Sequence, residues 1–136
     1  MMPTIDRPVP SSWRAFFLVA ALYDIILGAV FLVAGASILT AIGMALPPHT
    51  AYIQLSAVFI FIQGLGYWFI YRDPWSNRGL VRMGVAYKFG YAGLAFYYLL
   101  IGQLPSPFFI PWAVVDLLFL IGFVSFLRLA ARPTGA

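Results

Sequence analysis

Residues 13–39 read WRAFFLVAALYDIILGAVFLVAGASIL, an apolar run interrupted near its middle by one carboxylate, Asp24. A helix of about 20 apolar residues crosses the hydrocarbon of a bilayer, so this run is long enough to span it with some tilt. Ala34–Ala36 resembles a small-residue cleavage site, but the run is much longer than the roughly 7–15 residues of a signal-peptide core. We therefore expect a retained transmembrane helix.

The composition of the whole chain agrees with this reading. Of its 136 residues, 63% are hydrophobic and 9% are charged, whereas soluble domains carry about 25% charge. The absence of cysteine excludes disulfides, thiolate catalysis and iron–sulfur clusters. The net charge of +4 does not indicate a nucleic-acid partner, because the basic residues flank apolar runs instead of forming one soluble basic face.

Three more apolar runs follow the first, separated by short stretches rich in proline, glycine or polar residues. We predict transmembrane helices over residues 13–40, 51–71, 80–101 and 108–131, preceded by a cytoplasmic arm (1–12) and followed by a cytoplasmic tail (132–136). Short connections make successive helices antiparallel neighbours. The predicted fold is therefore all-α, an integral membrane four-helix bundle with up-down-up-down topology.

Charge predicts the orientation of this bundle. All the arginines fall on the side shared by the N-terminus, the middle loop and the C-terminus, and the other two loops contain no Lys or Arg. Positively charged residues near helix ends are retained in the cytoplasm. We expect a multi-pass protein of the cytoplasmic (inner) membrane with both termini cytoplasmic. The arginines concerned are Arg7, Arg14, Arg72, Arg78, Arg82, Arg128 and Arg132.

Each predicted helix carries, in its middle part, a polar residue that lipid would not favour: Asp24, Gln63, Lys88 and Asp116. At a rise of about 1.5 Å per residue, each lies roughly 9–18 Å inward from an arginine on the same helix, near the middle of the membrane. An unpaired charge there costs from about 2.5 to well over 10 kcal/mol. We therefore expect these side chains to face inward and meet, with Lys88 pairing an aspartate and Gln63 satisfying the remaining geometry.

Helical spacing places aromatic residues beside this polar cluster, and we predict that Tyr67, Tyr91 and Trp112 belong to it. Two carboxylates and one ammonium leave one negative charge unbalanced. Either one aspartate binds a proton or another cation enters the cluster. No metal or other cofactor is expected, because the single histidine, His49, has no partner ligands nearby in sequence.

Several functions are compatible with this cluster. It could fix only the order and rotation of the helices, form part of a pocket for a lipid-like or aromatic small molecule, or serve as a proton path in a proton-coupled transporter. A membrane enzyme using Asp24 or Asp116 as general acid and base is a further alternative. No nucleophile, base and orienting residue occur together in a recognisable pattern.

The length, the four apolar helices, the very short loops and the Gly84-x-x-x-Lys88 spacing resemble the DoxX-like group of small bacterial membrane proteins. The resemblance implies an accessory subunit of a membrane oxidoreductase, a partner and not the catalyst. Our leading expectation is thus a non-catalytic accessory subunit or small-molecule binder. The partners expected are membrane lipids, an apolar small molecule, and a larger membrane complex or a second copy of the chain.

Overall fold

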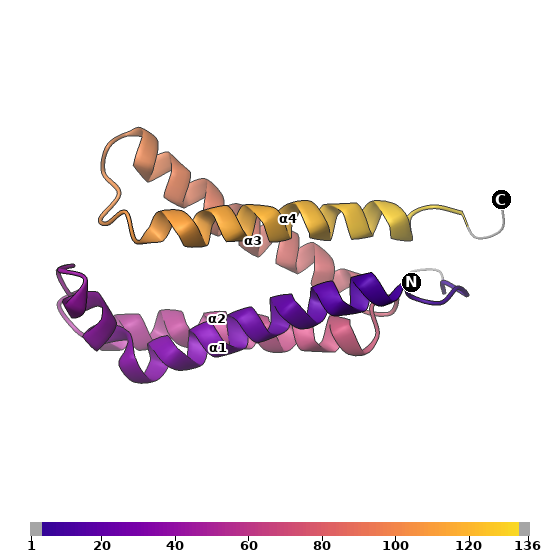
Figure 1. Cartoon of the computed structure of the whole chain (residues 1–136), viewed down its shortest axis with the longest axis horizontal. Coiled ribbons are helices and arrows are strands. Elements are labelled where there is room, and N and C mark those ends of the chain that lie inside the picture. Colours follow the sequence, from indigo (N-terminus) through magenta and orange to yellow (C-terminus); the bar gives the residue numbers. More distant parts are fainter. Residues whose placement is uncertain (1–3, 134–136) are drawn as a thin grey trace.

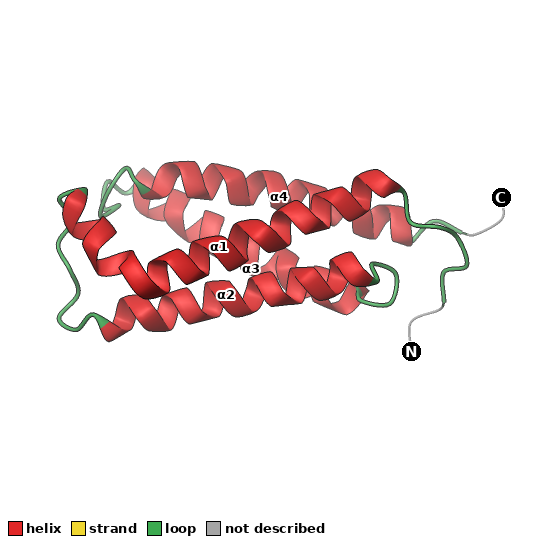
Figure 2. Ribbon diagram, turned by 60° about the horizontal axis from the view of Figure 1, so that its bottom comes forward, coloured by secondary structure: helices red, strands yellow, loops and turns green. Residues whose placement is uncertain are grey.

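The structure is a computed structural model that describes residues 4–133, and within this range it contains four α-helices and no strand. Residues 1–3 of the predicted arm and 134–136 of the predicted tail lie outside the described residues. The helices form one elongated bundle (Figures 1 and 2), which confirms the predicted fold class. They are α1 (Ser11–Ala41), α2 (Ala51–Arg72), α3 (Arg78–Leu100) and α4 (Phe109–Ala130).

The helix limits differ from the predicted ones by at most two residues at each end, and the earlier start of α1 has a local cause. α1 begins at Ser11 because the carbonyl of Pro10 accepts hydrogen bonds from the backbone N–H groups of Trp13 and Arg14. α4 begins at Phe109, so Pro111 is its third residue. The first N–H groups of a helix have no partner within it, and proline is tolerated there. Pro111 therefore costs α4 no hydrogen bond.

The helices form two antiparallel hairpins, α1 with α2 and α3 with α4, and α3 runs obliquely across the bundle (Figure 1). α1 has no Cα atom within 8 Å of any in α3, and the same holds for α2 and α4. These two pairs are therefore diagonal in the bundle. The first and last described residues lie at the same end (Figure 2).

Glycines bring the backbones of α1 and α2 into contact. A Cβ atom on Gly28 would lie 2.5 Å from the backbone nitrogen of Phe61, and one on Gly64 would lie 2.6 Å from that of Ile25. Membrane helices gain packing energy where small residues allow such close approach. The contact lies within one helical turn of Asp24 and therefore sets the position of that residue against α2.

Aromatic side chains fill the space between the two hairpins in the half of the bundle nearest the termini. Phe17, Tyr67, Phe123 and Phe126 are fully buried there. Phe17 and Phe126 meet edge to face with their ring centroids 4.9 Å apart, and the ring centroids of Tyr67 and Phe123 are 5.0 Å apart in the same arrangement. This is a favoured geometry for aromatic pairs. The aromatic core joins α1 to α4, whose backbones make few contacts.

The N-terminal arm packs onto this end of the bundle. Ile5 and Val9 contact the core, and the guanidinium of Arg7 donates a hydrogen bond to the backbone carbonyl of Leu129. The indole N–H of Trp75 donates to the carbonyl of Arg7 at 2.7 Å. The described part of the predicted arm is thus a strap across the α2–α3 turn and the end of α4, and its last two predicted residues are helical in α1.

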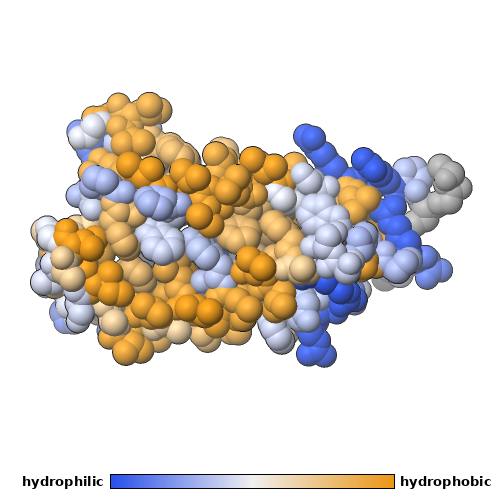
Figure 3. Space-filling model, viewed as in Figure 1, coloured by the Kyte–Doolittle hydropathy of each residue, from blue (hydrophilic) through white to orange (hydrophobic). Residues whose placement is uncertain are grey.

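Three helices, α1, α2 and α4, are long and apolar enough to cross a membrane. The face of the bundle that Figure 3 shows is largely apolar along its length, and hydrophilic residues gather at the end where the termini lie. The chain is therefore a small membrane protein. α3 has 23 residues, but Lys88, its four tyrosines and its glycines lower its hydropathy, so that its crossing of the membrane stays a prediction.

Candidate functional site

A buried ion triad links three helices at the middle of the bundle. The ammonium of Lys88 in α3 lies 3.1 and 3.0 Å from the two carboxylate oxygens of Asp24 in α1, and 2.8 Å from Oδ1 of Asp116 in α4. The three residues are 1%, 1% and 5% exposed. An ammonium has three N–H donors, and these three oxygens accept from all of them. The structure thus brings the three charged side chains together inside the bundle, as the sequence predicts.

Aromatic rings enclose the ammonium on its remaining sides. Four ring centroids lie 5.3–5.4 Å from Nζ of Lys88. The negative face of an aromatic ring attracts a cation, most strongly where water is excluded. The four rings therefore attract the ammonium of Lys88, as the two carboxylates also do. These rings belong to Tyr23, Tyr67, Tyr87 and Phe119.

Glycine also positions Lys88. Gly84 lies one turn before Lys88 in α3, and a Cβ atom there would lie 2.7 Å from the ring of Phe123 and 2.9 Å from that of Tyr67. α3 can therefore settle against these rings, which brings the lysine stem into the interior. The Gly84-x-x-x-Lys88 spacing thus has a packing reason in this chain.

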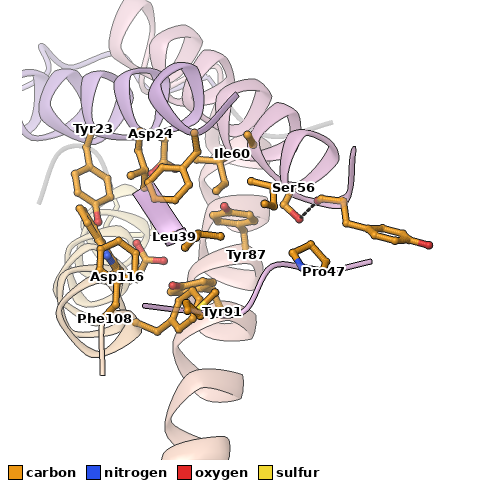
Figure 4. Close-up of a pocket in the computed structure, with 18 residues that line it drawn as sticks. Tyr23, Asp24, Leu39, Pro47, Ser56, Ile60, Tyr87, Tyr91, Phe108 and Asp116 are labelled. Atoms are coloured by element: carbon orange, nitrogen blue, oxygen red, sulfur yellow. Dashed lines mark hydrogen bonds between the residues drawn. The ribbon is translucent and has the colours of Figure 1, made fainter. Parts of the chain in front are cut away.

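A cavity of about 390 Å³ begins at the triad and extends toward the connection 42–50 and the start of α4 (Figure 4). All four helices contribute to its lining, and Asp24 and Asp116 lie at its inner end. Lys88 is absent from the lining, so the cavity meets the carboxylates while the ammonium lies behind them. The walls are mainly apolar, and the aromatic ones are Tyr23, Phe31, Tyr87, Tyr91, Phe108 and Trp112.

Two polar atoms at the inner end of the cavity have no protein partner. Among the described residues, Lys88 donates to Oδ1 of Asp116, and none donates to Oδ2. The hydroxyl of Tyr23 is buried and likewise has no hydrogen-bond partner in residues 4–133. In Figure 4 the Tyr23 side chain points toward Asp116. The inner end of the cavity therefore has unused hydrogen-bonding capacity beside a cluster whose formal charge is −1.

The other predicted site residues divide into three groups. Tyr91 and Trp112 line the cavity. Tyr67 contacts the triad through its ring but does not line the cavity. Gln63 is half-buried, and within the described residues it makes no hydrogen bond to Lys88 or to either aspartate, so it is not joined directly to the three charges. Gly64 faces α1, and Gln63, one residue earlier, is turned away from it by about 100° around α2.

Sequence reasoning did not single out Tyr23, Tyr87 or Phe108, which line the cavity. Two of them carry a signal in hindsight. Tyr87 precedes Tyr91 by four residues, the spacing of neighbours on one helix face, and Tyr23 is adjacent to Asp24. Phe108 has no such signal, because it reaches the cavity from the residue just before α4.

The part of the chain that the structure describes holds no group of three His, Cys, Asp or Glu side chains suited to a metal. His49 lies in the 42–50 connection, where its Nδ1 accepts a hydrogen bond from the backbone N–H of Ala51 at 3.1 Å. Comparison of the chain with protein-family models, with curated proteins and with solved structures found no match.

Proposed function

We propose that this membrane protein binds a lipid-like or aromatic small molecule in the cavity between its two hairpins, and that it is not itself a catalyst. The observation that carries the proposal is the cavity, with aromatic walls and carboxylates at its inner end. Its volume lies within the range of about 300–1,000 Å³ that is common for small-molecule sites. An ion triad that served only to fix the helices would need no such space beside it.

The chemistry of the walls indicates the class of ligand. Apolar and aromatic side chains from all four helices surround the cavity, and such lining favours an apolar body with a few polar groups at one end. The polar end of the ligand would meet Asp24, Asp116 and Tyr23. The apolar body would extend toward the connection 42–50 and Tyr52.

The resemblance to DoxX-like proteins adds a cellular setting to the proposal. In that setting the chain is an accessory subunit of a larger membrane complex in the cytoplasmic membrane, and the bound molecule serves the partner enzyme. The arginine-rich end of the bundle would face the cytoplasm. The chain has no cysteine, so labelling single cysteines at Ser76 and at Thr50 with a membrane-impermeant maleimide in intact cells tests this orientation. We expect labelling at Thr50 alone.

The binding proposal is tested by native mass spectrometry of the protein purified in a mild detergent. We expect a bound small molecule in the wild type. Ile60 lines the cavity, and Ile62 on the same helix is 54% exposed outside it. Ile60→Trp should fill the cavity and remove the bound molecule, whereas the matched control Ile62→Trp should retain it. A wild type without any bound molecule, or equal loss in both variants, would contradict the proposal.

A second function, proton-coupled transport, is favoured by one observation. The triad holds two carboxylates and one ammonium, and the excess carboxylate is a group that can exchange a proton for a substrate. The test is flux of a small lipophilic amine into liposomes containing the protein under an imposed pH gradient. Transport requires a flux that depends on the gradient and disappears in Asp116→Asn, and its absence in the wild type would exclude this function.

A further inference from the structure

The ion triad contains more negative than positive groups, namely two carboxylates and one ammonium. Lys88 compensates one of the two carboxylates, so the buried cluster carries a formal charge of −1. A buried net charge is costly unless an opposite charge or a hydrogen-bond donor reaches it. Within residues 4–133 no second cation pairs with Asp24 or Asp116, and every arginine lies in the N-terminal arm or close to the helix ends on the side of the bundle that contains the termini. A proton on one aspartate or a cation that enters the cavity would compensate this charge, and the cavity beside Asp116 has room for such a cation.

The geometry also indicates where this group would be placed. Asp24 gives both of its oxygens to Lys88, whereas Asp116 gives only Oδ1. Oδ2 of Asp116 and the hydroxyl of Tyr23 are two acceptors beside the triad to which no described residue donates a hydrogen bond. Both can accept a hydrogen bond from an N–H donor. The aromatic rings of Tyr23, Tyr87 and Trp112 beside them favour a cation over a second anion.

We propose that the molecule bound in this cavity is an amphiphilic amine that carries one positive charge. Its protonated amino group donates hydrogen bonds to Oδ2 of Asp116 and to the Tyr23 hydroxyl, and its apolar or aromatic body occupies the cavity. The resulting cluster has two carboxylates and two ammonium groups and is neutral. This inference rests on the proposed binding function and names the ligand class for it.

The test compares two soluble probes that differ only in their polar group, 4-phenylbutylamine and 4-phenylbutanol. Binding is measured by isothermal titration calorimetry on the protein in phosphatidylcholine nanodiscs near neutral pH, with empty nanodiscs as the blank. Charge pairs at a desolvated site have measured couplings of about 1.5 kcal/mol and upward, so we expect the amine to bind at least about tenfold more tightly than the alcohol. Equal affinities would overturn the proposal and need no variant.

Substitution of Asp116 assigns the preference to its carboxylate. Asp116→Asn leaves the Lys88–Asp24 pair, so the buried cluster of this variant has no net charge to be compensated. We expect this variant to bind the amine no more tightly than the alcohol, with the affinity for the alcohol unchanged. Asp73→Asn, at an exposed carboxylate in the α2–α3 turn, is the control and should retain the full preference. A preference that survives in Asp116→Asn would contradict the proposal.

The outcomes separate this inference from the proposed function. Binding of both probes with equal affinity, blocked by Ile60→Trp, would leave the binding function intact and reject the charged ligand. Binding of neither probe, together with a purified protein that carries no small molecule, would reject both. A preference for the amine that Asp116→Asn abolishes supports both.

Discussion

Lys88 and Asp24 join helices that lie diagonally across the bundle. No Cα atom of α1 lies within 8 Å of one in α3, yet the ammonium of Lys88 contacts both carboxylate oxygens of Asp24 at 3.1 and 3.0 Å. The long lysine stem crosses the gap that the backbones leave open. Asp116 completes the connection from α4. One buried side chain therefore connects the α1–α2 hairpin to the α3–α4 hairpin.

Removal of the lysine charge should destabilise the bundle. Lys88→Met leaves two buried carboxylates without a cation, and breaking a buried pair in this way costs about 3–5 kcal/mol. The neutral triple variant Asp24→Asn, Lys88→Met, Asp116→Asn should recover most of this loss, because no buried charge remains. Denaturant unfolding in detergent, followed by circular dichroism, measures both. A Lys88→Met variant as stable as the wild type would show that the triad does not hold the hairpins together.

The glycine contact between α1 and α2 should tolerate no side chain. Gly64→Ala would place a Cβ atom 2.6 Å from the backbone nitrogen of Ile25, and overpacking of this kind costs about 1–3 kcal/mol. Gly66 in the same helix has open space around it, so Gly66→Ala should be neutral or slightly stabilising, since alanine favours helices by about 1 kcal/mol. Thermal unfolding in detergent compares the two. Equal effects would contradict the close approach.

The strap formed by the N-terminal arm should depend on Trp75. Trp75→Phe keeps an aromatic ring against Phe126 but removes the N–H that donates to the carbonyl of Arg7. A hydrogen bond of this kind contributes about 0.5–1.5 kcal/mol, so the arm should detach more often. Endoproteinase Asp-N, which cleaves before Asp6, should then cut faster. Trp68→Phe is the matched control, and the same acceleration there would argue against a specific role for Trp75.

The turn between α2 and α3 contains a pH-sensitive contact. Hydrogen bonds from the side chain and the backbone N–H of Ser76 lower the pKa of Asp73 below its ordinary value. A lowered pKa stabilises the folded state above the unfolded pKa, near 3.9, and this contribution is lost as the pH falls through the folded value. Asp73→Ala should therefore be less stable than the wild type near pH 6, with a difference that shrinks below about pH 4. A difference that is constant with pH would contradict this contact.

The charges of the site were predictable because lipid leaves few options. Asp24, Lys88 and Asp116 each interrupt an apolar helix near its middle, and hydrocarbon cannot solvate them separately. Their meeting inside the bundle therefore follows from their positions along the helices. Gln63 is different, because a neutral amide can remain half-buried at the edge of α2 at lower cost than a charge. Membrane depth alone could not decide its place.

The amino-acid sequence by itself determined the class of protein, the four helices, their antiparallel order and the need for the charges to face inward. These follow from apolar length, helical period and the cost of an unpaired charge, all of which are local. Only the tertiary structure decided that one lysine serves both aspartates, that Oδ2 of Asp116 remains unpaired, and that a cavity lies beside it. Those features depend on how far each helix is rotated and tilted against its neighbours. Contacts between residues distant in sequence, such as Gly64 against Ile25 and Gly84 against Phe123, set these rotations.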